Sequence, residues 1–197
     1  MSKLTLDDIA DLRAYERERD DFRRSIIALK RRRRVGLGDF VTLLFENSRT
    51  VRFQIQEMAR AEKLLSDEAV QTELDIYNPL VPEPGQLRAT LFIELTSKQA
   101  LMEWLPKLVG IEQAVALRLA DGTEVPALVD EDHARQLTRE EITASVHYVG
   151  WQLTPAQVET FASGPVVLVA NHAHYAVETP LSEDTWTELV GDLRHGG

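Results

Sequence analysis

Residues 39–47 read DFVTLLFEN, and this stretch decides how the sequence around it is interpreted. Its apolar run is too continuous for a strand with one face in water, so it predicts a strand buried in the middle of a sheet. Between Val51 and Leu65 the apolar residues recur at helical spacing, and Asn47 or Ser48 can cap that helix. A buried strand followed directly by an amphipathic helix indicates helices packed on a sheet.

Further helices are expected on both sides of this unit. Thr5 with Asp8 three residues later imitates a capping box, which predicts a helix start at the next residue. Residues 20–34, DDFRRSIIALKRRRR, begin with acidic and end with basic side chains, as the helix dipole favours. Residues 66–77, SDEAVQTELDIY, open with a serine cap and an acidic first turn. The N-terminal half is therefore predicted to be rich in helix.

The rest of the chain mixes strands and helices. Strand patterns occur at residues 87–95, 114–119, 124–129, 146–153 and 164–181, and helix starts occur at Thr96, Thr154 and Ser182. Asp121-Gly122 predicts a hairpin turn, and Pro126 places the returning strand at a sheet edge. Because regular βαβ alternation is missing, we expect an α+β protein with a mostly antiparallel sheet. Residues 1–197 are predicted to form one domain, with a helix-rich half (1–110) and a strand-rich acidic half (111–197).

Composition indicates an ordinary globular protein. Hydrophobic residues make up 44% of the chain and charged residues 27%, and there is no cysteine. The sequence shows no signal peptide and no apolar run long enough to span a bilayer, so we expect a soluble, cytoplasmic protein. The net charge of −10 arises in the second half, since residues 101–197 hold 5 basic and 15 acidic side chains while residues 1–100 hold 17 of each. An acidic surface disfavours nonspecific binding to nucleic acid.

The helix after the buried strand carries the first candidate site. Residues 50–60, TVRFQIQEMAR, combine one apolar stripe with many polar side chains. These side chains either form a solvated helix face with weak pairs, or converge with the end of the strand at a polar pocket. Such a pocket would bind a carboxylate or phosphate, or a partner protein, through its arginines. The candidate binding residues are Glu46, Arg52, Gln54, Gln56, Glu57 and Arg60.

Two further features suggest other functions. The run Lys30–Arg34 could contact phosphates of nucleic acid, but it also suits the C-terminal end of a helix, or docking to an acidic partner or to the acidic half of the same chain. On a strand, His172 and His174 would project to one face and could bind zinc or iron, with His147 or Glu178 completing the site. A metal-dependent enzyme using this histidine pair is therefore an alternative function.

Familiar catalytic signatures are missing from the sequence. It contains no P-loop, no GxGxxG, no GxSxG and no HExxH motif. No catalytic residue is assigned, and the sequence leaves the oligomeric state open.

The stretches IALKRRRRVGLGDFVTLLFENSRTVRFQIQEMARAEKL and YNPLVPEPGQLRATLFIEL carry a resemblance. With them in view, the chain resembles an uncharacterised bacterial family known as a domain of unknown function, whose members are often encoded beside rubrerythrin-like proteins. The resemblance implies an accessory role in a redox or oxidative-stress system, with a redox partner protein, and carries over no catalytic residue. Where the family is expected to have a single histidine before proline and tyrosine, this chain has His172, Ala173, His174 and Tyr175, which argues against a family-wide metal site.

Overall fold

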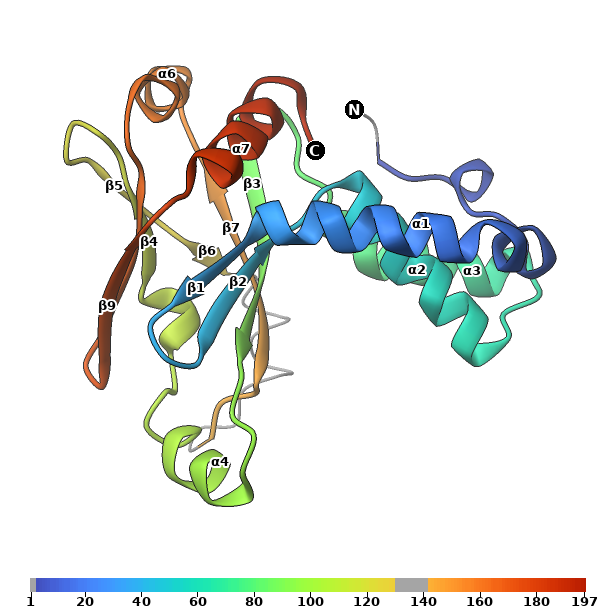
Figure 1. Ribbon diagram of the computed structural model, residues 1–197, viewed down its shortest axis with the longest axis horizontal. Helices are drawn as coiled ribbons and strands as arrows, with labels where there is room; N and C mark the ends of the chain where they lie inside the picture. The colour runs from blue at the N-terminus through green and yellow to red at the C-terminus, as the bar shows by residue number, and fades with distance from the viewer. Residues whose placement is uncertain (1–2, 130–141) are drawn as a thin grey trace.

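The structure is a computed structural model that describes residues 3–129 and 142–197. Helices and two antiparallel sheets make up this part of the chain (Figure 1). The helical elements are η1 (Leu6–Asp8), α1 (Leu12–Arg33), α2 (Ser48–Glu62), α3 (Asp67–Tyr77), η2 (Asn78–Leu80), α4 (Lys98–Trp104), η3 (Ile111–Gln113), α6 (Pro155–Ser163) and α7 (Glu183–His195). The strands are β1 (Arg34–Leu37), β2 (Val41–Phe45), β3 (Gln86–Ile93), β4 (Val115–Arg118), β5 (Glu124–Pro126), β6 (Leu128–Val129), β7 (Val146–Gln152), β8 (Val167–His172) and β9 (Tyr175–Pro180).

The first sheet has five strands in the order β1-β2-β3-β7-β6. β2 is the strand predicted to be buried, and all five of its residues are. It pairs with β1 on one side and β3 on the other, so every backbone group can find a partner. Each strand pair in both sheets is antiparallel, which confirms the predicted α+β class with an antiparallel sheet.

The second sheet has four strands in the order β5-β4-β8-β9. β4 and β5 form the predicted hairpin, and Gly122 in its turn has a φ of 85°. Pro126 lies on β5 at the sheet edge, as predicted, because a proline cannot donate to a further strand. β8 and β9 form a second hairpin.

The main core lies between the two sheets. Leu91 and Trp151 from the five-stranded sheet belong to the same buried cluster as Val115 and Leu168 from the four-stranded sheet. Side chains on a strand alternate between faces, so one face of the five-stranded sheet is committed to this core. α6 and α7 lie together at one end of the sheets (Figure 1), and α7 contributes Leu189 to the core. The opposite face of the five-stranded sheet is left to meet the N-terminal helices.

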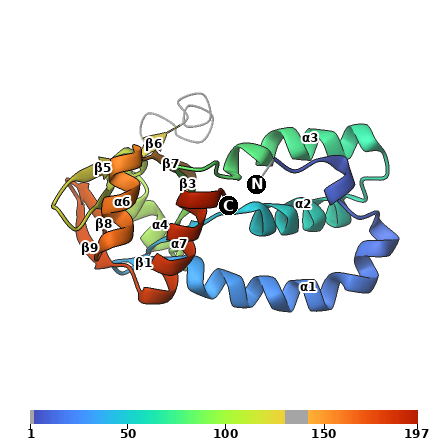
Figure 2. The same cartoon turned by 90° about the horizontal axis from the view of Figure 1, so that it is seen from above.

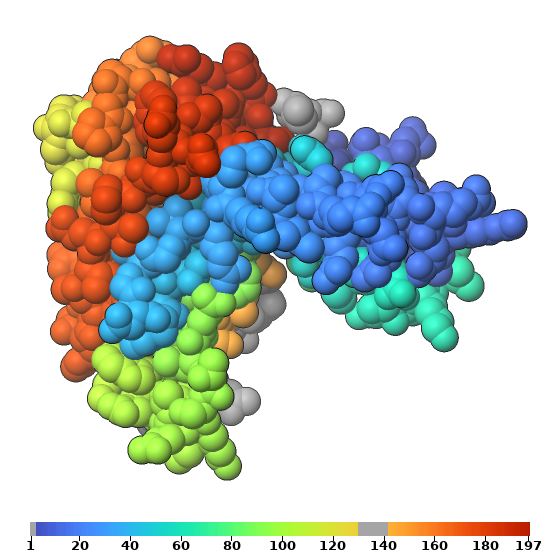
Figure 3. All heavy atoms as spheres, in the orientation of Figure 1, coloured from blue at the N-terminus to red at the C-terminus, as the bar shows by residue number. Residues whose placement is uncertain are grey.

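Those helices form a lobe that extends away from the sheets, which we call the helical lobe: η1, α1, α2, α3 and η2 (Figure 2). It has its own small core of Val51, Ile55, Leu74, Leu80 and Val81. Figure 3 shows that the lobe and the sheets meet at a re-entrant corner, below α1 in that view. The face of the five-stranded sheet that is turned away from the main core therefore borders the helical lobe.

Three helix predictions were wrong in their limits. α1 begins at Leu12 rather than at residue 20, because Asp11 caps it by accepting a hydrogen bond from the amide of Ala14. The capping box at Thr5 is present but opens only one 3₁₀ turn, η1. α4 is capped by Ser97 rather than by the predicted Thr96, and it ends at Trp104. In the described part of the chain, no helix combines the length and apolar composition needed to cross a membrane.

Candidate functional site

Two adjoining cavities lie on the face of the five-stranded sheet that is turned away from the main core. Alternate residues of β3 line them, from Gln86 to Phe92, while the residues between these are in the core. We call them the Arg88 cavity, of about 280 Å³, and the Glu46 cavity, of about 170 Å³. Leu80 and Tyr148 line both, so the two cavities are neighbours. Together they offer the space for one small molecule at the junction of sheet and helical lobe.

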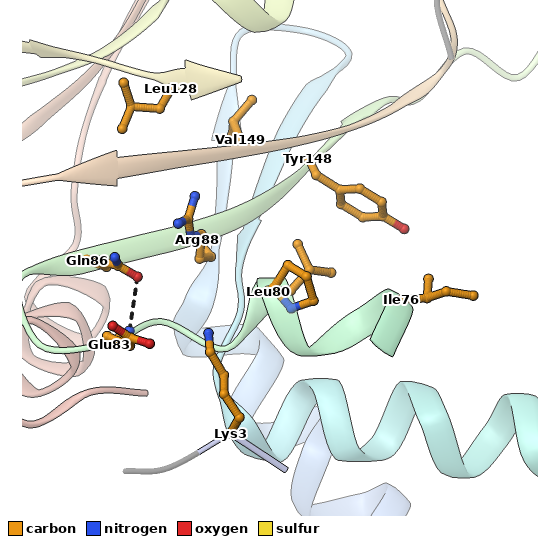
Figure 4. Close-up of a pocket in the computed structure, with 10 residues that line it drawn as sticks. Lys3, Ile76, Leu80, Glu83, Gln86, Arg88, Leu128, Tyr148 and Val149 are labelled. Carbon is orange, nitrogen blue, oxygen red and sulfur yellow. Dashed lines mark hydrogen bonds between the residues drawn. The ribbon is translucent and has the colours of Figure 1, made fainter. Parts of the chain in front are cut away.

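The Arg88 cavity is lined by residues that lie far apart in the sequence, from Lys3 to Val149 (Figure 4). β3 supplies Arg88 and β7 supplies Tyr148, while the N-terminal segment brings in Lys3. Its lining is made of Lys3, Ile76, Pro79, Leu80, Glu83, Gln86, Arg88, Leu128, Tyr148 and Val149.

The position of Arg88 depends on its neighbour across the sheet. Arg88 is paired in register with Gly150 of β7, and a Cβ atom at residue 150 would meet the Arg88 guanidinium. The absence of a side chain there lets the guanidinium lie across β7. Arg88 is thereby held at the cavity from one side by the backbone of the next strand.

Lys3 is the second cation of the Arg88 cavity. Its ammonium donates to the carbonyl of Val81 at 2.6 Å. Burial lowers the pKa of Lys3; Glu83 acts in the opposite direction, and the positive charge of Arg88 lowers it further. Lys3 and Arg88 are thus close enough for their charges to repel, and an anion between them would relieve that repulsion.

The Arg88 cavity combines charged and apolar side chains. Lys3 and Arg88 are half-buried, whereas Glu83 is exposed, where water screens its charge. Ile76 and Leu128 are large apolar side chains with 50% and 51% of their surface exposed, and both border the cavity. A carboxylate could meet the cations while its hydrocarbon part covers these two side chains.

The Glu46 cavity has a carboxylate at its wall. Glu46 is 8% exposed, and its two oxygens accept hydrogen bonds from the hydroxyls of Thr90 (2.7 Å) and Thr50. The backbone amide of Glu46 donates to the carbonyl of Arg88 at 2.8 Å. The two charged residues that name the cavities therefore stand on neighbouring chain segments.

Aromatic side chains surround this carboxylate. Tyr77, Phe92 and Tyr148 line the Glu46 cavity. Burial raises the pKa of Tyr148, and the nearby acidic groups of Tyr77 and Glu46 add to the increase. The full lining is Lys30, Leu44, Glu46, Thr50, Val51, Gln54, Tyr77, Leu80, Thr90, Phe92, Val146 and Tyr148.

Of the six residues predicted as a binding site, Glu46 and Gln54 line the Glu46 cavity. Arg52 instead contacts α1 and the segment before it, donating to the carbonyl of Asp8 at 2.7 Å and to Glu18 at 3.1 Å. Gln56 is fully buried and exchanges two hydrogen bonds with the backbone of Ala10. Arg52 and Gln56 therefore hold the parts of the helical lobe together.

The last two predicted residues also bind α1. Glu57 accepts two hydrogen bonds from Arg19, both of 2.8 Å, and one from the Tyr15 hydroxyl at 2.7 Å. Arg60 pairs with Glu16. Neither residue lines either of the two described cavities. The convergence of all six residues on one pocket is not what the structure shows, and their use by a partner protein stays a prediction.

The predicted metal residues lie at the β8–β9 turn. The ring nitrogen Nε2 of His172 is 3.0 Å from the carbonyl of Val109, and its Nδ1 accepts from the amide of His174 at 3.3 Å. The other two candidate ligands are engaged elsewhere, since His147 is buried on β7 and Glu178 pairs with Arg118. Within residues 3–129 and 142–197, no group of three or more histidine or acidic side chains is placed to hold a metal ion.

The basic run at the end of α1 meets acidic residues of the same chain. Arg32 pairs with Glu188 of α7, and Arg34 pairs with Glu94. Arg33 is fully buried, pairs with Asp192 and donates to the backbone carbonyl of Phe45 at 2.9 Å. Docking of the basic run to the acidic half, one of the readings left open by the sequence, is therefore observed, and it leaves fewer cations for phosphates.

Sequence reasoning missed Lys3, Arg88 and Tyr148. The pattern QLRATLF did carry a signal for Arg88, because polar residues alternate with buried apolar ones along β3. That alternation marks a second, polar face of the strand. Lys3 and Tyr148 reach the cavity only through the folding of distant segments, and no local pattern marks them.

Comparison with known proteins places the chain in a family. The family described as "Protein of unknown function (DUF3501)" matches residues 3–193. The chain belongs to this family. A crystal structure of a novel protein of unknown function from Burkholderia pseudomallei is similar to the DUF3501 chain, with 38% sequence identity and a TM-score of 0.90. The match covers 98% of this chain and 100% of that one. A comparison with functionally curated proteins finds no match.

Proposed function

We propose that this DUF3501 protein binds a small molecule with an anionic group and a short apolar body, and that the Arg88 cavity holds the anionic group. The observation that carries the proposal is the pair of half-buried cations, Lys3 and Arg88, beside the exposed apolar side chains of Ile76 and Leu128. A planar guanidinium suits a carboxylate with two parallel hydrogen bonds. Apolar walls with a few polar groups are the usual composition of small-molecule sites.

The physiological setting is a separate part of the proposal. The resemblance to proteins encoded near rubrerythrin-like partners supports an accessory role in a redox or oxidative-stress system, and ligand binding is compatible with that role. A protein partner on the outer face of α2, around Arg52 and Arg60, would be a separate interaction. The ligand-binding proposal depends on neither of these.

Calorimetric titration with caproate tests the proposal. Caproate has one carboxylate and a short hydrocarbon chain, and a probe of this size is expected to bind in the millimolar range. Arg88→Met keeps most of the apolar stem and removes the guanidinium, so binding should weaken by roughly tenfold or more, as expected for the loss of a hydrogen bond to a charged group. Arg24→Met, on the exposed surface of α1, is the matched control and should bind as the wild type does.

Two results would overturn the proposal. One is the failure of the wild-type protein to bind caproate at concentrations where a site of this kind is occupied. The other is equal affinity of the wild type and Arg88→Met, which would place caproate elsewhere. A folded state for each variant is checked by its thermal melting curve.

A further inference from the structure

We propose that the Glu46 cavity is a second subsite that binds a cationic group, so that the ligand carries an ammonium at one end and an anionic group at the other. The class of ligand is an amino carboxylate with a short apolar chain between its two charges. The anionic end rests on the function proposed above. The cationic subsite rests on separate residues and is tested separately.

The carboxylate of Glu46 is fixed before any ligand arrives. The hydroxyls of Thr50 and Thr90 hold one oxygen each, and each carboxylate oxygen can accept a further hydrogen bond. The backbone at this point is held as well, because the buried side chain of Arg33 donates to the carbonyl of Glu46 at 3.1 Å. An acceptor held in this way loses little freedom when it binds an ammonium.

The walls of the cavity suit a cation. Tyr77, Phe92 and Tyr148 border the space beside the Glu46 carboxylate. The face of an aromatic ring attracts a cation, and the attraction is strongest where water is excluded. The carboxylate accepts one threonine hydrogen bond at each oxygen, whereas a glutamine has a single acceptor oxygen. Its negative charge also attracts a positive partner.

Lys30 also lines the Glu46 cavity, but its ammonium is placed over the ring of Phe53, 5.5 Å from the ring centroid. Among the ion pairs of the described residues, none joins Lys30 to Glu46. Lys30 would repel a bound cation weakly from the edge of the cavity. Lys30→Met should therefore strengthen the binding of an amine.

The sheet sets the distance between the two subsites. Phe45 is in register with Ala89, so the next residue of that segment, Glu46, stands opposite Arg88. The Glu46 carboxylate accepts a hydrogen bond from Thr90, which lies two residues along β3 from Arg88. At the usual rise of a strand, the Cα atoms of Arg88 and Thr90 are about 7 Å apart. The ligand should therefore hold its two charges apart along an extended chain, as ε-aminocaproate does and as the shorter γ-aminobutyrate does less well.

The experiment is a set of calorimetric titrations of the full chain with hexylamine, caproate and ε-aminocaproate. Hexylamine should bind the wild type and should bind Glu46→Gln roughly tenfold or more weakly, because a charge-assisted hydrogen bond is lost. Arg24→Met, on the exposed surface of α1, should leave hexylamine binding unchanged. ε-Aminocaproate should bind more tightly than either single-charge probe, and Glu46→Gln and Arg88→Met should each weaken it.

The outcomes separate this inference from the proposed function. Binding of hexylamine with no binding of caproate would support the cationic subsite and overturn the anionic one. Equal binding of hexylamine to the wild type and Glu46→Gln, or no binding to the wild type, would overturn the cationic subsite whatever caproate does. If Glu46→Gln does not fold, Tyr148→Leu replaces it, since removal of this aromatic wall should also weaken hexylamine, by a few-fold. Unchanged hexylamine binding in Tyr148→Leu would then count against the subsite.

Discussion

Replacing Glu57 by glutamine tests whether the polar face of α2 builds the helical lobe or serves a ligand. The Glu57 carboxylate accepts two hydrogen bonds from Arg19 and one from Tyr15. The bonds from Arg19, and then the one from Tyr15, lower the pKa of Glu57 to about 2 from its ordinary value of 4.5. Because the pair is partly exposed, water screens it. We expect a loss of about 2 kcal/mol in the free energy of unfolding, at the lower end of the range for charged hydrogen bonds.

For a chain of this length, that loss corresponds to a Tm lower by about 4–8 °C. The folded-state pKa of Glu57 lies below the unfolded value, so its contribution is complete above about pH 5 and is lost as the pH falls toward 2. The difference in Tm between wild type and Glu57→Gln should therefore shrink over that interval. Differential scanning calorimetry measures it, with Glu62→Gln, an exposed residue at the end of α2, as the matched control. A Glu57→Gln protein that melts like the wild type at neutral pH would refute the structural role.

Three further predictions follow from other parts of the fold. Arg33→Met should cost about 3–5 kcal/mol in urea denaturation, because it leaves a buried carboxylate without its partner, whereas Arg31→Met on the exposed side of the same helix should stay within about 0.5 kcal/mol of the wild type. Gly38→Ala should lower stability by about 1–3 kcal/mol in the same assay, since Gly38 has a φ of 73° and a Cβ atom there would clash with a buried tyrosine hydroxyl. Mass spectrometry of protein purified without chelator should find well under one equivalent of zinc or iron, with no difference in a variant lacking His172 and His174; stoichiometric metal that is lost in the variant would favour the metal-dependent enzyme instead.

Local patterns predicted most of the elements because their physical causes are local. Asn47 caps α2 through a hydrogen bond to a backbone amide three residues away, and the sequence shows both groups. Thr154 and Pro155 likewise start α6 where predicted. The predicted start of α1 is wrong because residues 12–20 are strongly charged and show no clear apolar stripe. Charged side chains such as arginine and glutamate nevertheless form helices readily.

The candidate site was harder to predict because it depends on which strands become neighbours. Glu46 could be proposed from its place after a buried strand. Arg88 becomes its neighbour only through the pairing of β2 with β3, and Tyr148 only through the pairing of β3 with β7, a segment almost 60 residues further along the chain. Pairings of this kind follow from the packing of the whole sheet. Arg52 looked like a ligand-binding arginine because its partners on α1 are distant in sequence.

The measurement that tests the central claim most directly is a nuclear magnetic resonance titration of ¹⁵N-labelled protein with caproate. If the face of the five-stranded sheet beside the helical lobe is the binding site, the amide signals of Gln86, Arg88 and Tyr148 should shift together and saturate with one affinity. Shifts that instead cluster on α2 around Arg52 and Glu57, or an unchanged spectrum, would contradict the assignment of the binding site to the Arg88 cavity.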